Sequence, residues 1–238
     1  MFSPPPVTYV DNGKYIRIPV ENGEVIYTRY YVNPRAEFTI LYCHGNNEDI
    51  GSNIKQMQRF RKKGFSVLTF DYRGYGLSAG KSSVENTYRD SRAVYDYLVN
   101  QLAVDPAKII VMGRSLGGGV AVELASDKPV GGLILQSTFV TINRVLTGNM
   151  LRMPFEKYNN IRKITEVNCP VLVIHGKDDK LVRIWHGKKL FAAANEPKFY
   201  LWVDGTDHED DIAAIAPDGY WTAFKKLADA VKRQPYTR

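Results

Sequence analysis

Short hydrophobic runs recur along the chain, and longer segments whose hydrophobic residues follow a helical period separate most of them. The short runs are rich in β-branched and aromatic residues, which is typical of β-strands. They predict eight strands, at residues 14–20, 25–32, 38–43, 66–70, 109–112, 133–135, 171–174 and 199–203. The helical patterns predict helices at residues 52–63, 84–102, 116–126, 185–194 and 217–231. An Asn-Gly pair between the first two strands favours a hairpin turn.

Continuous apolar strands that alternate with helices predict a mostly parallel sheet with helices on both faces. We therefore expect an α/β fold with an eight-stranded sheet, in which the N-terminal hairpin adds antiparallel strands at one edge. Residues 1–238 are expected to form one domain, with a short cap insertion at about residues 139–168. Ligands of such sheets bind at the carboxyl ends of the strands, so functional side chains are expected directly after strands.

Residues 113–119 read Gly-Arg-Ser-Leu-Gly-Gly-Gly and contain the pattern Gly-x-Ser-x-Gly. A predicted strand ends just before the pattern and a predicted helix begins within it, which is the context that a nucleophile elbow requires. The glycines two residues on either side of Ser115 remove Cβ atoms that would clash in a tight, strained turn. A Walker-type phosphate loop needs a lysine before the serine or threonine, and none precedes Ser115. We predict that Ser115 is a nucleophile.

A serine nucleophile needs a base, and the chain offers four histidines: His44, His175, His186 and His208. In this type of fold the chain order is serine, acid, histidine, so His44 is too early. His186 lies in a helical pattern and is expected on the surface. His208 alone follows the last predicted strand in a polar loop, with acidic residues between it and Ser115. It is therefore the predicted general base.

The acid that orients the base is expected at another strand end. Asp178 and Asp179 both follow the strand predicted at residues 171–174, whereas no acid follows the strand before it. Spacing alone does not separate these two neighbours.

Five blocks of sequence together resemble the α/β-hydrolase superfamily. They are residues 41–47 (Leu-Tyr-Cys-His-Gly-Asn-Asn), 71–76 (Asp-Tyr-Arg-Gly-Tyr-Gly), 113–118, 175–179 (His-Gly-Lys-Asp-Asp) and 205–208 (Gly-Thr-Asp-His). In particular, the blocks at residues 44–46, 71–76 and 113–118 resemble a small-capped subgroup that includes eukaryotic protein depalmitoylases and bacterial relatives.

This resemblance implies roles for particular residues. The acid would be the last residue of His-Gly-x-x-Asp, which is Asp179. The backbone amides of Asn46 and Leu116 would form the oxyanion hole. His44 and residues 71–76 would be structural supports.

The predicted chemistry is hydrolysis of a carboxylic ester or thioester through an acyl-enzyme on a Ser-Asp-His triad, without a metal or an organic cofactor. The expected partner is a small-molecule ester, lipid or acyl substrate. A peptidase with the same triad and a catalytically silent binding protein of this fold are the alternatives. Several apolar cap residues could line an acyl pocket or pack the cap onto the core: Met150, Leu151, Met153, Pro154 and Phe155.

Charge and composition change this picture little. The net charge of +7 and the pI of about 9.2 come from basic residues spread along the chain, which favours a solvated basic face over nucleic-acid binding. The cap is rich in basic residues, which favours anionic substrates or weak contact with membrane surfaces: Arg144, Arg152, Lys157, Arg162 and Lys163. No apolar run reaches the roughly 20 residues of a membrane span, and no signal peptide is recognisable, so a cytoplasmic protein is expected.

Cys43 and Cys169 are expected to be buried free thiols. The oligomeric state stays open.

Overall fold

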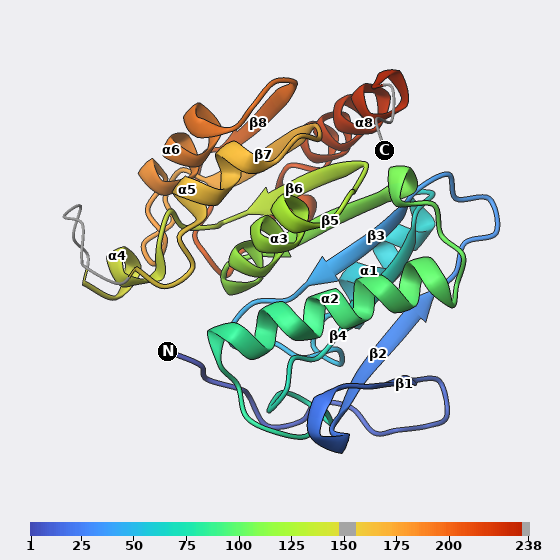
Figure 1. The fold of residues 1–238 in the computed structure, drawn as a ribbon. Helices are drawn as coiled ribbons and strands as arrows, with labels where there is room; N and C mark the ends of the chain where they lie inside the picture. The colour runs from blue at the N-terminus through green and yellow to red at the C-terminus, as the bar shows by residue number, and fades with distance from the viewer. Residues whose placement is uncertain (148–155, 235–238) are drawn as a thin grey trace.

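An eight-stranded sheet runs through the computed structural model, which describes residues 1–147 and 156–234 (Figure 1). The strands are β1 (Ile16–Pro19), β2 (Val25–Tyr31), β3 (Thr39–Cys43), β4 (Ser66–Phe70), β5 (Ile109–Arg114), β6 (Gly132–Gln136), β7 (Val171–Gly176) and β8 (Lys198–Val203). Their order in the sheet is β1-β2-β4-β3-β5-β6-β7-β8. The pairs β1–β2 and β2–β4 are antiparallel, and the other pairs are parallel. The predicted fold, including its antiparallel edge, is confirmed.

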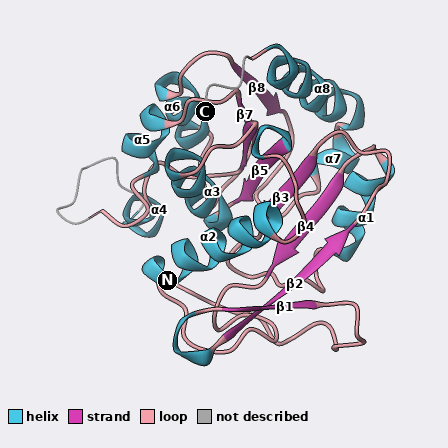
Figure 2. Cartoon of the chain, turned by 45° about the vertical axis from the view of Figure 1, so that its right-hand side comes forward, coloured by secondary structure: helices cyan, strands magenta, loops and turns pink. Residues whose placement is uncertain are grey.

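Helices cover both faces of the sheet (Figure 2). The α-helices are α1 (Ile54–Lys62), α2 (Val84–Asn100), α3 (Leu116–Asp127), α4 (Ile142–Thr147), α5 (Asn160–Lys163), α6 (Trp185–Ala193), α7 (Ile212–Ile215) and α8 (Pro217–Arg233). Short 3₁₀ turns are η1 (Glu21–Gly23), η2 (Pro106–Lys108) and η3 (Ile164–Glu166). Helices α2, α3 and α6 contribute to the hydrophobic cluster on one face of the sheet. Helices α1, α7 and α8 contribute to the cluster on the other face.

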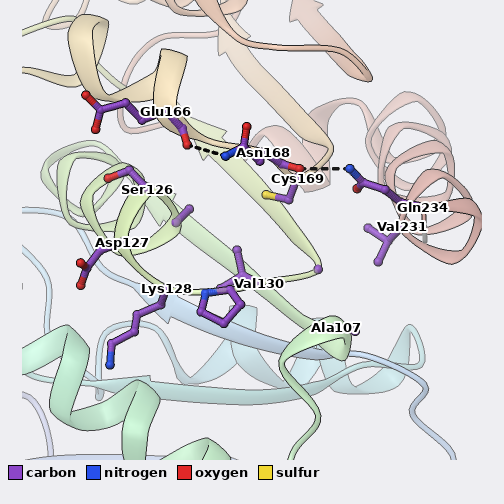
Figure 3. A pocket seen from close by; sticks show the side chains of 13 residues that line it. Ala107, Ser126, Asp127, Lys128, Val130, Glu166, Asn168, Cys169, Val231 and Gln234 are labelled. Carbon is purple, nitrogen blue, oxygen red and sulfur yellow. Dashed lines mark hydrogen bonds between the residues drawn. The ribbon is translucent and has the colours of Figure 1, made fainter. Parts of the chain in front are cut away.

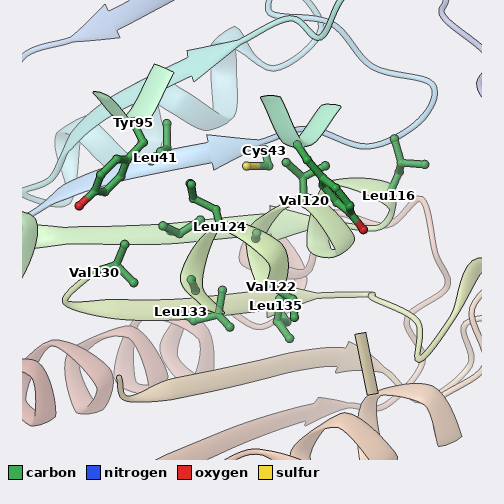
Figure 4. Packing of buried hydrophobic residues seen from close by; sticks show 14 of the residues in the cluster. Leu41, Cys43, Tyr95, Leu116, Val120, Val122, Leu124, Val130, Leu133 and Leu135 are labelled. Atoms are coloured by element: carbon green, nitrogen blue, oxygen red, sulfur yellow. The ribbon is translucent and has the colours of Figure 1, made fainter. Parts of the chain in front are cut away.

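The alternation of side chains along each strand divides the core between these two faces. In β3, Ile40 and Tyr42 join the cluster beneath α1 and α8, whereas Leu41 and Cys43 join the cluster beneath α2 and α3. Figure 4 shows Leu41 and Cys43 together with residues of α3, including Val120. Helix α3 is buried along ten of its twelve residues, so the element that follows Ser115 is held firmly in the core.

The connection between β6 and β7 contains α4, α5 and η3, in the region predicted as a cap. The predicted pocket residues Met150, Leu151, Met153 and Phe155 lie outside the described residues. Neither residues 1–147 nor residues 156–234 contain a helix long and apolar enough to cross a lipid bilayer.

Both cysteines are free and buried, as predicted. Burial raises the pKa of the Cys169 thiol to about 12 and shifts that of Cys43 in the same direction. A thiol that stays protonated is a poor nucleophile, so neither sulfur competes with Ser115 as a candidate nucleophile.

Candidate active site

Ser115 stands at a sharp turn between β5 and α3. Its backbone has φ 52° and ψ −117°, which is a conformation that non-glycine residues rarely adopt. A Cβ atom added to Gly113 would lie only 2.3 Å from the carbonyl oxygen of Gly117. Strand and helix therefore approach so closely that this turn requires glycine, as the sequence pattern predicted.

The three side chains predicted as a triad form one hydrogen-bonded chain. The Oγ of Ser115 lies 3.0 Å from Nε2 of His208. The Nδ1 of His208 lies 2.8 Å from Oδ2 of Asp179. The structure thus places Asp179, and not Asp178, against the imidazole. These residues follow β5, β7 and β8, at the carboxyl ends of three parallel strands.

Polar contacts between two loops fix the approach of Asp179 to His208. The Asp178 carboxylate accepts a hydrogen bond from the Gly205 amide at 2.7 Å. The Asp207 carboxylate accepts from the amides of Lys180 at 2.9 Å and of His208 at 2.7 Å. Asp178 and Asp207 therefore join the loop after β7 to the loop after β8. Sequence reasoning considered Asp178 only as a rival of Asp179, because the spacing gave no sign of this contact across the loops.

The carboxylate of Asp179 is held in its ionised form. Its burial acts to raise the pKa, but hydrogen bonds from His175 and His208 and from the Val182 amide outweigh burial and hold the pKa well below the usual range. The Oδ1 atom accepts from the Val182 amide at 2.7 Å and from the Leu181 amide at 3.0 Å. A charged, fully bonded carboxylate is suited to hold one imidazole tautomer and to stabilise the imidazolium.

The expectation that His186 is a surface residue is wrong. Its exposed fraction is 2%, and Val140, from the start of the cap, donates its amide hydrogen to His186 Nδ1 at 3.2 Å. The ring stacks on Trp185 at a centroid distance of 3.7 Å. Burial, together with the neighbouring His175, lowers the pKa of His186 to about 3. His186 is therefore a neutral packing residue.

Acid should destabilise the protein through His186. Between pH 6.5, the ordinary histidine value, and about 3, the unfolded chain binds a proton that the folded chain excludes. Stability therefore rises with pH across this window, by up to about 1.4 kcal/mol per pH unit for one group. In urea titrations from pH 7 to pH 4, His186→Asn is expected to lose less stability than the wild type. Equal losses in the two proteins would show that His186 does not cause the acid sensitivity.

The two amides predicted to form an oxyanion hole lie on adjoining segments. Leu116 is the first residue of α3, where helical N–H groups have no acceptor within the helix. A Cβ on Gly117 would lie 2.1 Å from the Cys43 carbonyl oxygen, so the start of α3 packs directly on the end of β3. The loop that contains Asn46 begins there. The Asn46 side chain accepts from the Tyr75 hydroxyl at 2.7 Å. The role of the two amides stays a prediction.

Residues near the N-terminus form hydrogen bonds with the loop that follows β3 and with the loop that follows β4. No pattern in the sequence indicated these contacts. The amide of Thr8 donates to Asp49 Oδ2 at 2.8 Å. The Tyr9 hydroxyl donates to the buried Asp71 at 2.5 Å, and the Ile50 amide donates to the same carboxyl at 2.8 Å. Burial raises the pKa of Asp71 to about 7. These contacts tie the loop after β3 to the loop after β4.

His44 also belongs to this support. Its Nδ1 lies 2.8 Å from the Gly45 carbonyl oxygen, and its own carbonyl accepts from the Tyr72 hydroxyl at 2.9 Å. Burial lowers the pKa of His44. Its other ring nitrogen, Nε2, lies 3.5 Å from Oδ1 of the buried Asp71, so the ring packs as a structural residue.

Two cavities lie at opposite ends of the sheet. One of about 390 Å³ lies beside the acid and is lined by Lys177, Asp178, Asp179, Lys180, Arg183, Ile184 and Trp185. The other, of about 400 Å³, lies where β6 and β7 begin and includes Lys128, Glu166 and Gln234 (Figure 3). Ser115 lies at the carboxyl end of β5, so this second cavity is remote from the triad.

Charged groups of the cap are partly paired within the chain. Arg144 Nε lies 3.3 Å from Glu156 Oε1, and Lys163 pairs with Glu123 of α3. This pairing reduces the positive charge of the cap that is available to bind an anionic substrate or membrane.

Within residues 1–147 and 156–234, no three His, Cys, Asp or Glu side chains are grouped so that they could hold a metal ion.

Comparison with known proteins places the chain in a family. A family model described as serine aminopeptidase, S33, matches residues 34–160, which is more than half of the chain. The chain is 39% identical over 176 residues to an uncharacterized protein of Mycobacterium tuberculosis. It is 33% identical over 184 residues to alpha/beta hydrolase domain-containing protein 17B of Homo sapiens. The chain belongs to the α/β-hydrolase superfamily, as the sequence blocks indicated.

The extent of these matches differs between sequence and structure. The alignments cover 72% and 75% of this chain but only 63% and 62% of the two relatives, respectively. Among solved structures, the esterase Pf2001 of Pyrococcus furiosus superposes with a TM-score of 0.79 at 20% identity, covering 96% of this chain and 97% of that chain. At that identity the likeness shows a shared fold.

Proposed function

We propose that this protein is a serine hydrolase that cleaves carboxylic esters, including thioesters, through an acyl-enzyme on Ser115. The observation that carries the proposal is the unbroken chain of hydrogen bonds from Ser115 through His208 to Asp179, at 3.0 Å and 2.8 Å. The strained backbone of Ser115 supports it, because strain of this kind clusters at functional sites.

The proposed reaction has two halves. His208 takes the proton of the Ser115 hydroxyl as Oγ attacks the carbonyl carbon, and Asp179 stabilises the imidazolium that forms. The amides of Asn46 and Leu116 donate to the oxyanion, an effect worth about 10²–10³ in rate for one donor in other enzymes. The leaving alcohol or thiol departs with the proton held by His208. Water, deprotonated by the same imidazole, then cleaves the acyl-serine ester and releases the carboxylic acid.

A peptidase is the second candidate, because the matching family model is described as a serine aminopeptidase. The same three side chains can cleave an amide, but the leaving nitrogen must be protonated as it departs. An ester places a smaller demand on the site. Esters and thioesters are therefore the favoured substrates.

A substrate panel separates these candidates. p-Nitrophenyl esters of graded acyl length, an acyl thioester and aminoacyl arylamides are to be compared by kcat/KM. We expect turnover of esters and thioesters. For the arylamides, kcat/KM should be at least about tenfold lower, which corresponds to an activation free energy higher by about 1.4 kcal/mol. Preferential cleavage of arylamides would favour the peptidase, and inertness toward every substrate would favour a silent binding protein.

A further inference from the structure

Arg114, the residue directly before Ser115, has contacts that the proposed reaction does not use. Its side chain is 10% exposed and leaves β5 on the same face as Ile110 and Met112, since alternate residues share a face. It pairs through Nη1 with Oε1 of Glu48. Its Nη2 donates to the carbonyl oxygen of His208 at 2.9 Å.

The Glu48 side chain extends this contact into the loop after β3. Its other carboxylate oxygen, Oε2, accepts from the Gly45 amide at 2.8 Å and from Asn53 Nδ2 at 3.2 Å. Gly45 precedes Asn46, whose amide is one of the two proposed oxyanion donors. Glu48 is 15% exposed, so this charge pair is largely shielded from water.

One guanidinium thus connects three parts of the candidate site. It leaves the strand that ends at Ser115, reaches the backbone of His208, and is bonded to the carboxylate that holds the amide next to Asn46. Its planar fork of donors allows two acceptors to be held at fixed angles. The bond to Glu209 at 3.1 Å contributes less, because that carboxylate is 80% exposed.

We propose that Arg114 and Glu48 are positioning residues, which set the oxyanion loop and the His208 loop relative to Ser115. The inference rests on the proposed function and deepens it. Displacement of reacting groups by about 1 Å can cost on the order of 10²-fold in rate. Removal of the bridge should therefore lower kcat, whereas substrate binding by the rest of the site should change little.

The test compares Arg114→Met, Arg114→Lys and Glu48→Gln on a p-nitrophenyl ester. We expect Arg114→Met to lower kcat by roughly 10–100-fold, with KM within about threefold of the wild type. Arg114→Lys should recover part of the rate, because a single ammonium provides charge but not the fork. Glu48→Gln keeps an acceptor for the Gly45 amide and is expected to lower kcat less than Arg114→Met.

Arg92→Met is the matched control. Arg92 also bridges two carboxylates, those of Glu123 at 2.8 Å and Asp127 at 2.7 Å. These acids lie eight and twelve residues beyond Ser115, which is at least about 12 Å along α3. Loss of the Arg92 guanidinium should therefore leave kcat unchanged.

Active-site titration with a fluorophosphonate separates positioning from folding. Each kcat is divided by the fraction of chains that the probe titrates, so a merely structural role would reduce the titrated fraction and leave the normalised kcat unchanged. An unchanged normalised kcat in both Arg114→Met and Glu48→Gln would overturn the inference. A wild type that neither hydrolyses esters nor reacts with the probe would instead overturn the proposed function, and the inference with it.

Discussion

Replacing Ser115 with alanine is expected to lower kcat for ester hydrolysis by about 10⁵–10⁶-fold. The hydroxyl is the group that would form the covalent bond to the acyl carbon, and alanine leaves His208 without a nucleophile to deprotonate. Serine and alanine both carry a Cβ atom, so the strained backbone at position 115 should cost the variant no more than the wild type. Folding should therefore be retained. The measurement is steady-state kinetics on a p-nitrophenyl ester, with circular dichroism to verify the fold.

Ser126→Ala provides a control within the same helix. The Ser126 hydroxyl donates to the Glu123 carbonyl oxygen near the end of α3, at 2.9 Å, and has no place in the proposed reaction. Wild-type rates are expected for this variant. Ester hydrolysis that survives in Ser115→Ala at the wild-type rate would exclude Ser115 as the nucleophile.

Replacing Asp179 with asparagine is expected to lower kcat by about 10⁴-fold. Asparagine is nearly the same size, but it carries no charge and can turn an NH₂ group toward His208, which selects the wrong tautomer. The depressed pKa of Asp179 means that the wild-type carboxylate stays charged at neutral and mildly acidic pH. The loss in the variant should therefore persist across neutral and mildly acidic pH.

The same substitution at the adjacent residue, Asp178→Asn, is the most stringent control for Asp179→Asn. The Asp178 carboxylate accepts from the Gly205 amide, and an amide oxygen can replace it in that bond. We expect kcat within a few-fold of the wild type, because this bond between the two loops is kept. A larger loss in Asp178→Asn than in Asp179→Asn would show that the acid has been assigned to the wrong neighbour.

The sequence predicted the fold from local patterns, and it predicted the close approach of Ser115 and His208 because both follow strands whose carboxyl ends meet at one edge of the sheet. A strand, a tight glycine turn and a helix are all contiguous around Ser115, and the loop of His208 follows directly after a strand. The choice of Asp179 over Asp178 came from family resemblance, since neighbouring residues after one strand cannot be separated by spacing. The structure places Asp179 against the imidazole at 2.8 Å.

Other features depend on contacts between distant residues and could not be predicted. Glu48 and Arg114 are 66 residues apart, and no periodic pattern links a loop acid to a buried strand arginine. His186 is buried because the start of the cap covers its helix, which a helical pattern does not reveal. Helix α7 has four residues, too few for a hydrophobic period to show.

The most direct test of the account is to locate the adduct of a fluorophosphonate probe by mass spectrometry of the intact chain and of its peptides. The account predicts one adduct per chain, on the peptide that contains Ser115, and no adduct in Ser115→Ala. An unlabelled wild-type chain, or an adduct on a different residue, would contradict it.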